Sequence, residues 1–279
     1  MLLELLAWAV TPASLDARRT GHLTAAISLW SRAGRCRTAW AAHEARCHAI
    51  VERAITGLAM RRTCVVLGSG LLRDVPLPRL AAAFEQVILV DVVHLWPARL
   101  AARRHANVSL RDLDVTGTTD LLLDRATGIG DPLGRLRADA TIDLVISANC
   151  LSQLALLPVE RAARGRLRPI RRIGDLGRRI VAGHLEALDR FAARVCLLTD
   201  TVGIELDGEG REIERYDLLE GVALPEADES WDWTLAPRGE SGDRTILHRA
   251  HGFVDFHAAR ARSRPAIGRG AGEGGGRGG

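Results

Sequence analysis

Lysine is absent from this chain of 279 residues, so each of its 38 basic residues is an arginine. A P-loop needs a lysine to reach the phosphates, and a pyridoxal enzyme needs one for its Schiff base. A dehydrogenase of the tyrosine–lysine type needs a lysine beside its tyrosine, and the only tyrosine here is Tyr216. The missing lysine excludes these three classes of enzyme.

Paired cysteines are missing as well. No C-x-x-C motif occurs, and the odd set of five thiols is scattered over Cys36, Cys47, Cys64, Cys150 and Cys196. Several of them lie in or beside apolar runs, where a free thiol behaves as a small hydrophobic side chain. This usage is typical of a reducing compartment, and we expect a cytoplasmic protein.

Neither a membrane nor a nucleic acid is indicated as a partner. The apolar stretch Met1–Val10 is interrupted by Glu4, lacks a preceding basic region and is too short to span a bilayer, so we expect a docking helix. The net charge of +4 is modest and spread out. The Gly/Arg-rich stretch Ser263–Gly279 holds too few arginines for a nucleic-acid site and is predicted to be disordered.

Apolar runs that alternate with helical patterns predict the fold class. The runs with strand character are Thr63–Leu67, Val87–Val90, Asn107–Leu110, Ile142–Ser147 and Arg194–Thr199. The helical stretches between them are Pro78–Glu85, Pro97–His105, Thr119–Arg125 and Ile173–Ala192. Such βαβ units predict an α/β domain with a doubly wound, mostly parallel sheet covered on both faces.

The flanking segments complete the expected organisation. Residues 1–60 read as a helical cap formed by Leu2–Ala9 and by a helix or helix pair over Leu23–Met60, with a possible break at Gly34. Residues 61–260 form the α/β domain, and 261–279 form the tail. Two final strands are expected over Arg211–Tyr216 and Thr245–Phe256, joined by a polar loop that contains Trp231-Asp232-Trp233.

The strongest functional signal is Gly68-Ser69-Gly70, which directly follows the first strand. Glycine lets the backbone turn sharply and approach a ligand without a Cβ in the way. Asp91 ends the second strand, where a carboxylate can accept hydrogen bonds from ribose hydroxyls. In open α/β sheets, ligands bind beyond the carboxyl ends of the strands. The two signals together predict a site for a nucleoside cofactor.

The residue that follows this turn bears on which cofactor binds. A dinucleotide fingerprint, G-x-G-x-x-G, needs a third glycine where this chain has Arg73. S-adenosylmethionine carries no phosphate and tolerates the loss of that glycine, so the pattern favours S-adenosylmethionine over NAD.

Four runs resemble successive motifs of the class I S-adenosylmethionine-dependent methyltransferases. They read CVVLGSGLLRDVPL, VILVDVVH, RDLDVTG and DLVISANCLSQL, and the resemblance extends over Thr63–Thr201. It implies that Gly68, Ser69 and Gly70 line the methionine part of the cofactor, that Asp91 holds the ribose, and that the adjacent Val92 also binds the cofactor.

The same resemblance implies further site residues. Asp112 or Asp114, after the third strand, would lie near the adenine. Ser147, Ala148 and Asn149, after the fourth, would face the sulfonium and the methyl acceptor.

The chain departs from the family pattern at two positions. Val66 stands where an acid is frequent, and Leu72 stands where a further glycine is usual. Asp74 could supply the missing carboxylate, although a surface or capping role suits it equally.

Candidates on the acceptor side are Asn149, Gln153 and His43. His43 and Cys47 share a helix face at i, i+4, but two ligands do not make a metal site, and none is predicted. Trp40, Arg35 and Arg37 lie on the same N-terminal segment, which could close over the cofactor. Cys150 has no histidine tied to it in sequence that would activate it as a nucleophile, and His94 could stack at the adenosine or cap a loop.

The predicted function is therefore methyl transfer to an unknown small molecule or protein, in an unknown oligomeric state. Two alternatives stay open: an oxidoreductase that uses NAD(P), and a methyltransferase-shaped binding protein without catalysis, for which Val66 and Leu72 are the supporting features.

Overall fold

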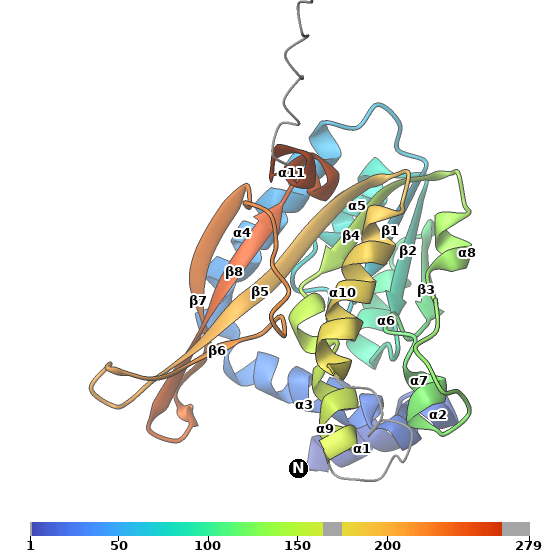
Figure 1. Cartoon of the computed structure of the whole chain (residues 1–279). Helices are drawn as coiled ribbons and strands as arrows, with labels where there is room; N and C mark the ends of the chain where they lie inside the picture. The colour runs from blue at the N-terminus through green and yellow to red at the C-terminus, as the bar shows by residue number, and fades with distance from the viewer. Residues whose placement is uncertain (1, 164–174, 264–279) are drawn as a thin grey trace, which may run out of the picture.

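The computed structural model describes residues 2–163 and 175–263, and its centre is one mixed sheet (Figure 1). The strands are β1 (Thr63–Leu67), β2 (Gln86–Asp91), β3 (Val108–Asp112), β4 (Ile142–Ala148), β5 (Arg194–Leu206), β6 (Glu212–Asp217), β7 (Glu229–Ser241) and β8 (Arg244–Phe253). Their order is β3-β2-β1-β4-β5-β8-β7, and β6 pairs with β5 outside this path.

The pairing directions confirm the predicted doubly wound, mostly parallel sheet. Strands β1 to β5 pair in parallel, whereas β6 and β8 run antiparallel to β5, and β7 runs antiparallel to β8. The chain proceeds from β1 outward to β3 and then returns to β4 on the other side of β1. This reversal opens a crevice at the carboxyl ends of β1 and β4, which is where such sheets bind ligands.

Helices cover both faces of the sheet. Their bounds are α1 (Leu2–Val10), α2 (Leu15–Thr20), α3 (His22–Arg35), α4 (Arg37–Thr56), α5 (Leu77–Ala83), α6 (Trp96–Ala102), α7 (Thr119–Leu122), α8 (Gly134–Arg137), α9 (Leu156–Ala163), α10 (Leu176–Asp189) and α11 (Phe256–Ser263), with a 3₁₀ turn at Leu151–Gln153. Successive residues of β1 point to opposite faces: Val65 packs in the core that includes α10, and Val66 packs in the core that includes α4.

The N-terminal helices divide into two groups. The expected Leu23–Met60 segment is a pair, α3 and α4, that meets at Cys36, and Gly34 lies inside α3. Helix α4 shares its core with the sheet, since Ile50 and Val51 belong to the same cluster as Val66. Helices α1 to α3 form a separate cluster with the loop after β2 and lie at one end of the sheet (Figure 1).

The C-terminal part differs from expectation. The predicted polar loop around Trp231-Asp232-Trp233 was wrong, because these residues lie in β7. Trp231 and Trp233 are buried while Asp232 between them is exposed, which is the two-residue alternation of a half-buried strand. Strand β5 continues past Thr199 to Leu206, where it pairs with β6 and β8.

Two further sequence expectations concern the ends and the partners of the chain. Residues 264–279 of the predicted tail lie outside the described residues, and Ser263 ends α11. Within the described residues, no helix combines the length and the apolar character needed to cross a membrane.

Candidate functional site

A cavity of about 400 Å³ lies at the crevice between β1 and β4. Its wall on one side comes from the segments that follow β1, β2 and β3. On the other side it comes from α4, the residues after β4, and strands β5, β7 and β8. Ala25, Ala26 and Leu29 of α3 also line it, so α3 covers this cavity, as the sequence suggested for an N-terminal helix.

The glycine turn lies at the centre of the cavity wall. Gly68 and Gly70 both adopt left-handed backbone conformations, with φ of 69° and 47°. A Cβ on Gly68 would also collide with the side chain of Cys150. Both features require glycine at position 68, because an L side chain would be strained and would also have no space.

Asp91 lies beside this turn. Its Oδ2 accepts the Gly70 N–H at 2.7 Å, and its Oδ1 accepts the Val92 N–H at 2.7 Å. Burial raises the pKa of the carboxyl, and the Gly70 N–H opposes this shift. An ionised carboxylate has about four acceptor positions, so Asp91 retains capacity for hydroxyl donors from a ligand in the cavity.

Leu72, one of the two residues that depart from the family pattern, adopts the left-handed backbone conformation that a glycine would adopt at this position. Leu72 has a φ of 61°, in the region that favours glycine, and its N–H donates to the Ser69 carbonyl at 2.9 Å. The turn therefore forms with leucine in place of glycine, at a cost of about 1–2 kcal/mol. The other residue that departs from the family pattern, Val66, lies fully buried in the core on the α4 side of the sheet.

Ser69 and Asp112 are connected through His94, which is fully buried. His94 Nδ1 lies 2.7 Å from Asp112 Oδ1, and its Nε2 lies 3.2 Å from Ser69 Oγ. Because a carboxylate only accepts hydrogen bonds, His94 donates from Nδ1 and accepts the Ser69 hydroxyl at Nε2. Ser69 lines the cavity, but Asp112 does not. Asp112 is therefore placed as a tether of the β1, β2 and β3 loops, which corrects its expected position at an adenine.

Asp114 does line the cavity, but its carboxylate is already saturated. It accepts from the backbone N–H and hydroxyl of Thr116 and Thr119, and from the backbone N–H of Thr118. These bonds hold the loop that leads into α7. The Asp114 carboxylate therefore shapes this wall of the cavity. It has no acceptor position left for the contact to an adenine amine that the sequence predicted.

Ser147 was also expected in the site, and the structure places it elsewhere. It is fully buried, its Oγ lies 3.1 Å from His184 Nε2, and it is not among the residues that line the cavity. Neighbouring residues of a strand face opposite ways, so Ser147 faces the α10 side while Ala148 reaches the cavity. Asn149 follows the end of β4 with a φ of 50°, and this change of backbone direction brings its side chain to the cavity as well.

His43 lines the acceptor side and has a defined protonation pattern. Its Nδ1 accepts the indole N–H of Trp231 at 3.0 Å, and its ring stacks on Trp233 with 3.9 Å between centroids. An indole N–H is a donor only, so Nδ1 carries no proton and the neutral ring carries its proton on Nε2. His43 therefore presents an N–H donor.

This donor explains the Asn149 amide, which lies 3.4 Å from His43 Nε2. With Nδ2 toward the ring, two donors would face each other and the buried Oδ1 would lack a partner. Turning the amide over places Oδ1 where it can accept the His43 N–H. Asn149 has a φ of 50°, and its carbonyl accepts the Gln153 amide at 3.0 Å. Both side chains line the cavity.

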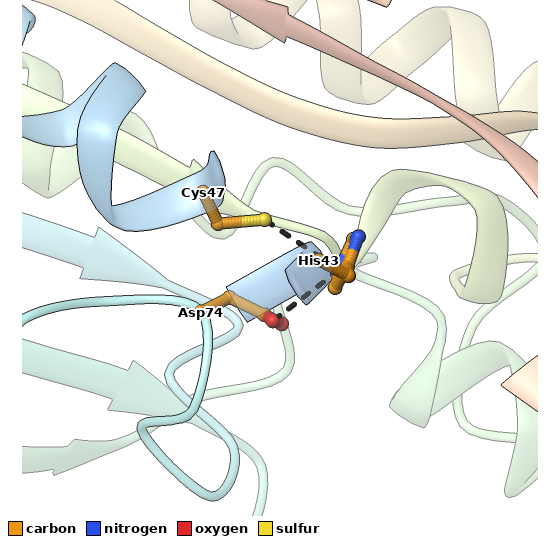
Figure 2. A group of neighbouring side chains, drawn as sticks. All are labelled: His43, Cys47 and Asp74. Carbon is orange, nitrogen blue, oxygen red and sulfur yellow. Dashed lines mark hydrogen bonds and ion pairs between the residues drawn. The ribbon is translucent and has the colours of Figure 1, made fainter. Parts of the chain in front are cut away.

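Cys47 and Asp74 approach the same histidine, and Figure 2 shows this cluster. The ligand-type atoms of His43, Cys47 and Asp74 lie within 4.8 Å of one another, so the spacing would suit a metal. The chemistry does not fit. A ligating histidine normally donates its other ring N–H to an acceptor, whereas His43 accepts there from Trp231. Burial also raises the pKa of the Cys47 thiol and keeps it protonated.

Three cavity residues were missed by the sequence reasoning: Asp200, Trp233 and His248. Asp200 Oδ2 lies 2.8 Å from His248 Nδ1, and its Oδ1 accepts the Trp233 indole N–H at 2.9 Å. They come from β5, β7 and β8, which the register brings together. The signal in the sequence was the position of Asp200, an acid that directly follows the fifth apolar run, Arg194–Thr199.

Cys150 borders the cavity close to Gly68. Burial raises the pKa of its thiol to about 11. The neutral thiol is a poor nucleophile.

Comparisons with known proteins give the following. No protein-family model and no curated protein matches this sequence. Among solved structures, 1,6-didemethyltoxoflavin-N1-methyltransferase from Burkholderia thailandensis, crystallised with 1,6-didemethyltoxoflavin and S-adenosylhomocysteine, is 16% identical with a TM-score of 0.39, covering 87% of this chain and 92% of that chain. The N-methyltransferase NodS from Bradyrhizobium japonicum WM9, in complex with S-adenosylhomocysteine, is 11% identical with a TM-score of 0.35, covering 74% and 85%. These identities and TM-scores are too low to support an argument, so the description of the fold rests on the strand order of this chain itself.

Proposed function

We propose that this protein is an S-adenosylmethionine-dependent methyltransferase. The observation that carries the proposal is the contact between the Gly70 N–H and the Asp91 carboxylate in the wall of the cavity. It joins a turn without side-chain bulk to an acceptor for hydroxyl groups, and a nucleoside with a small charged substituent needs both.

The loop after the turn argues against a dinucleotide. A pyrophosphate binds at a helix N-terminus placed directly after the glycine turn. Here the chain passes through turns, and α5 begins only at Leu77. The Arg73 guanidinium, which could otherwise meet a phosphate, donates to Glu44 at 2.6 Å. These features favour a cofactor without phosphate.

The residues of the cavity fit S-adenosylmethionine. Gly68 to Gly70 would hold its amino-acid part, Asp91 would accept its ribose hydroxyls, and Val92 would contact the base. When bound, the cofactor supplies an electrophilic methyl group. The chain contributes positioning, since Ala148 and Asn149 border the space between the two sides of the cavity.

The acceptor side of the cavity is polar and aromatic. Trp40, His43, Asn149 and Trp233 line it. A cavity of this size suits a small-molecule acceptor, which we favour over a protein. All five cysteines are free thiols, and this supports the expected cytoplasmic location as part of the same proposal.

Calorimetric titration tests the cofactor. We expect S-adenosylhomocysteine to bind the full-length protein in the micromolar range and NADH to give no heat. Heat with NADH alone would assign the oxidoreductase function instead. A folded sample that binds neither ligand would indicate a binding protein of methyltransferase shape.

A further inference from the structure

Asp200 and His248 form a hydrogen-bonded pair in the wall of the cavity. Both side chains are almost fully buried, with exposures of 4% for Asp200 and 10% for His248. Asp200 lies where β5 passes from its parallel to its antiparallel part, next to a bulge in the pairing with β8. The Trp233 indole N–H holds the second oxygen of the carboxylate.

The direction of these bonds assigns the protons on His248. An ionised carboxylate has no donor, so His248 donates its Nδ1–H to Asp200. The proton of the neutral ring is then on Nδ1, and the lone pair is on Nε2. Among the described residues, no group forms a hydrogen bond with this Nε2, and the ring lines the cavity.

His43 has the opposite tautomer on the same side of the cavity. Its Nδ1 accepts from Trp231, so its Nε2 carries a proton. Two histidines that are bonded through the same ring atom to opposite kinds of partner thus present one donor and one acceptor. The sequence alone cannot distinguish them, because the difference comes from Trp231 in one case and Asp200 in the other.

We propose that His248 is the general base of the reaction, with Asp200 as the residue that positions it. This inference rests on the proposed methyl transfer. The acceptor then bears a protic O–H or N–H group. Its oxygen or nitrogen forms the bond to the methyl carbon, the carbon–sulfur bond breaks with its electron pair going to sulfur, and the acceptor's proton passes to His248 Nε2. An adjacent base of this kind typically contributes 10²–10⁴-fold in rate.

Other charged groups around the cavity leave this role to His248. Arg32 lies 3.6 Å from Glu240, and Arg73 is bonded to Glu44. Asp74 lies 3.5 Å from His43 Nε2, so its carboxylate is directed to the donor histidine. Asp91 and Asp114 are engaged by backbone N–H groups, and the third cavity-lining histidine, His22, lies near these two carboxylates on the cofactor side. On the acceptor side, within the part of the chain that the structure describes, His248 Nε2 is therefore the nitrogen lone pair that a protic acceptor can meet.

The tautomers can be measured directly by long-range ¹H–¹⁵N NMR on the full-length protein. We expect the Nδ1–H form for His248 and the Nε2–H form for His43. In Asp200→Asn, the amide N–H can face His248 Nδ1, so that Nδ1 becomes the acceptor and the ring carries its proton on Nε2. The imidazole itself is retained. His251→Asn is the matched control, because His251 lies on the same strand but bonds Ser230 and does not line the cavity. An Nε2–H or doubly protonated His248 in the wild type would overturn the proposal.

A pair of ring probes tests the base role without a known acceptor. Phenol carries a proton and anisole does not. We expect phenol to shift the His248 Nε2 resonance, and anisole to leave it in place. His248→Asn keeps an N–H for Asp200 but has no atom at Nε2, so it should weaken phenol binding by about fivefold, the loss of one hydrogen bond. Equal responses to both probes, or none to phenol, would overturn the proposal.

The two proposals fail in different ways. If S-adenosylhomocysteine does not bind the wild type, the methyltransferase function is wrong even where the tautomers are as stated. If it binds, and both the Asp200→Asn and the His248→Asn variants bind it within about twofold while the tautomer or the phenol response is absent, only the base assignment is wrong.

Discussion

Gly68 and Cys150 face each other across the crevice with no space for another atom between them. A Cβ built on Gly68 would lie 2.8 Å from Cys150 Sγ and closer still to its Cβ. The close approach of the segments after β1 and β4 sets the floor of the cavity, so the shape of the site depends on this pair.

Gly68→Ala is therefore expected to destabilise the protein by about 2–4 kcal/mol, from steric overlap and from the left-handed conformation together. Denaturant unfolding measures this. Gly183→Ala is the matched control: Gly183 lies in α10 with open space around its Cα, so alanine there should stabilise by about 0.5–1 kcal/mol. If both variants behaved alike, the tight packing at Gly68 would be refuted.

Asp91→Asn should weaken S-adenosylhomocysteine binding by at least about tenfold, and destabilise the free protein by about 1–3 kcal/mol. An amide has one oxygen, so one of the Gly70 and Val92 N–H groups would face a second donor. Calorimetry and denaturant unfolding give the two values. Asp112→Asn, outside the cavity, should leave the affinity within about twofold. An unchanged affinity in Asp91→Asn would separate Asp91 from the cofactor.

His184 makes stability depend on pH. Burial lowers the pKa of its imidazole to about 4 from 6.5, and its Nδ1 has no partner among the described residues. Below pH 6.5 the unfolded chain takes up a proton that the folded protein resists, so stability is lost as pH falls from 6.5 toward 4. Between about pH 7.5 and about pH 5, we expect a loss of about 2 kcal/mol.

His184→Gln supplies the comparison for this pH dependence. Glutamine cannot titrate, and it keeps a polar group for the Ser147 hydroxyl. Its unfolding free energy should therefore change less with pH than that of the wild type. Parallel curves for the two proteins would show that His184 does not cause the pH dependence.

The cluster of His43, Cys47 and Asp74 should not bind zinc. Dialysis against a chelator is expected to leave Tm unchanged, and added zinc should not raise it, because an ion bound to the folded state would stabilise it. Trp231→Phe removes the N–H that fixes the His43 tautomer and is the informative variant. If the wild type retained zinc, and Trp231→Phe bound it no more tightly than the wild type, then the Trp231 N–H would not be what prevents His43 from binding a metal.

The sequence predicted the features that depend on neighbours along the chain. The run Thr63–Leu67 forms a strand with those bounds, and the glycines after it form the turn. Asp91 reaches that turn because parallel strands β1 and β2 end at the same edge. Apolar periodicity and backbone conformation are local properties, and the residues themselves carry them.

The polar partners could not be predicted in the same way. Asp112 and Ser147 lie at the carboxyl ends of β3 and β4, yet each is bound by a histidine from elsewhere in the chain and lies off the cavity wall. Asp200 and His248, which line the wall, are 48 residues apart and meet through the pairing of β5 with β8. Which side a strand residue faces depends on packing that no short window of sequence contains.

The amino-acid order alone determined that a parallel sheet would form, where its glycine turn would lie, and that an acid would end the second strand. Only the tertiary structure decided which carboxylates are free, which histidine donates and which accepts, and what lines the acceptor side. The physical reason is that strand formation follows from local backbone and apolar preferences, whereas the protonation pattern of a buried side chain depends on the partner that the fold places against it.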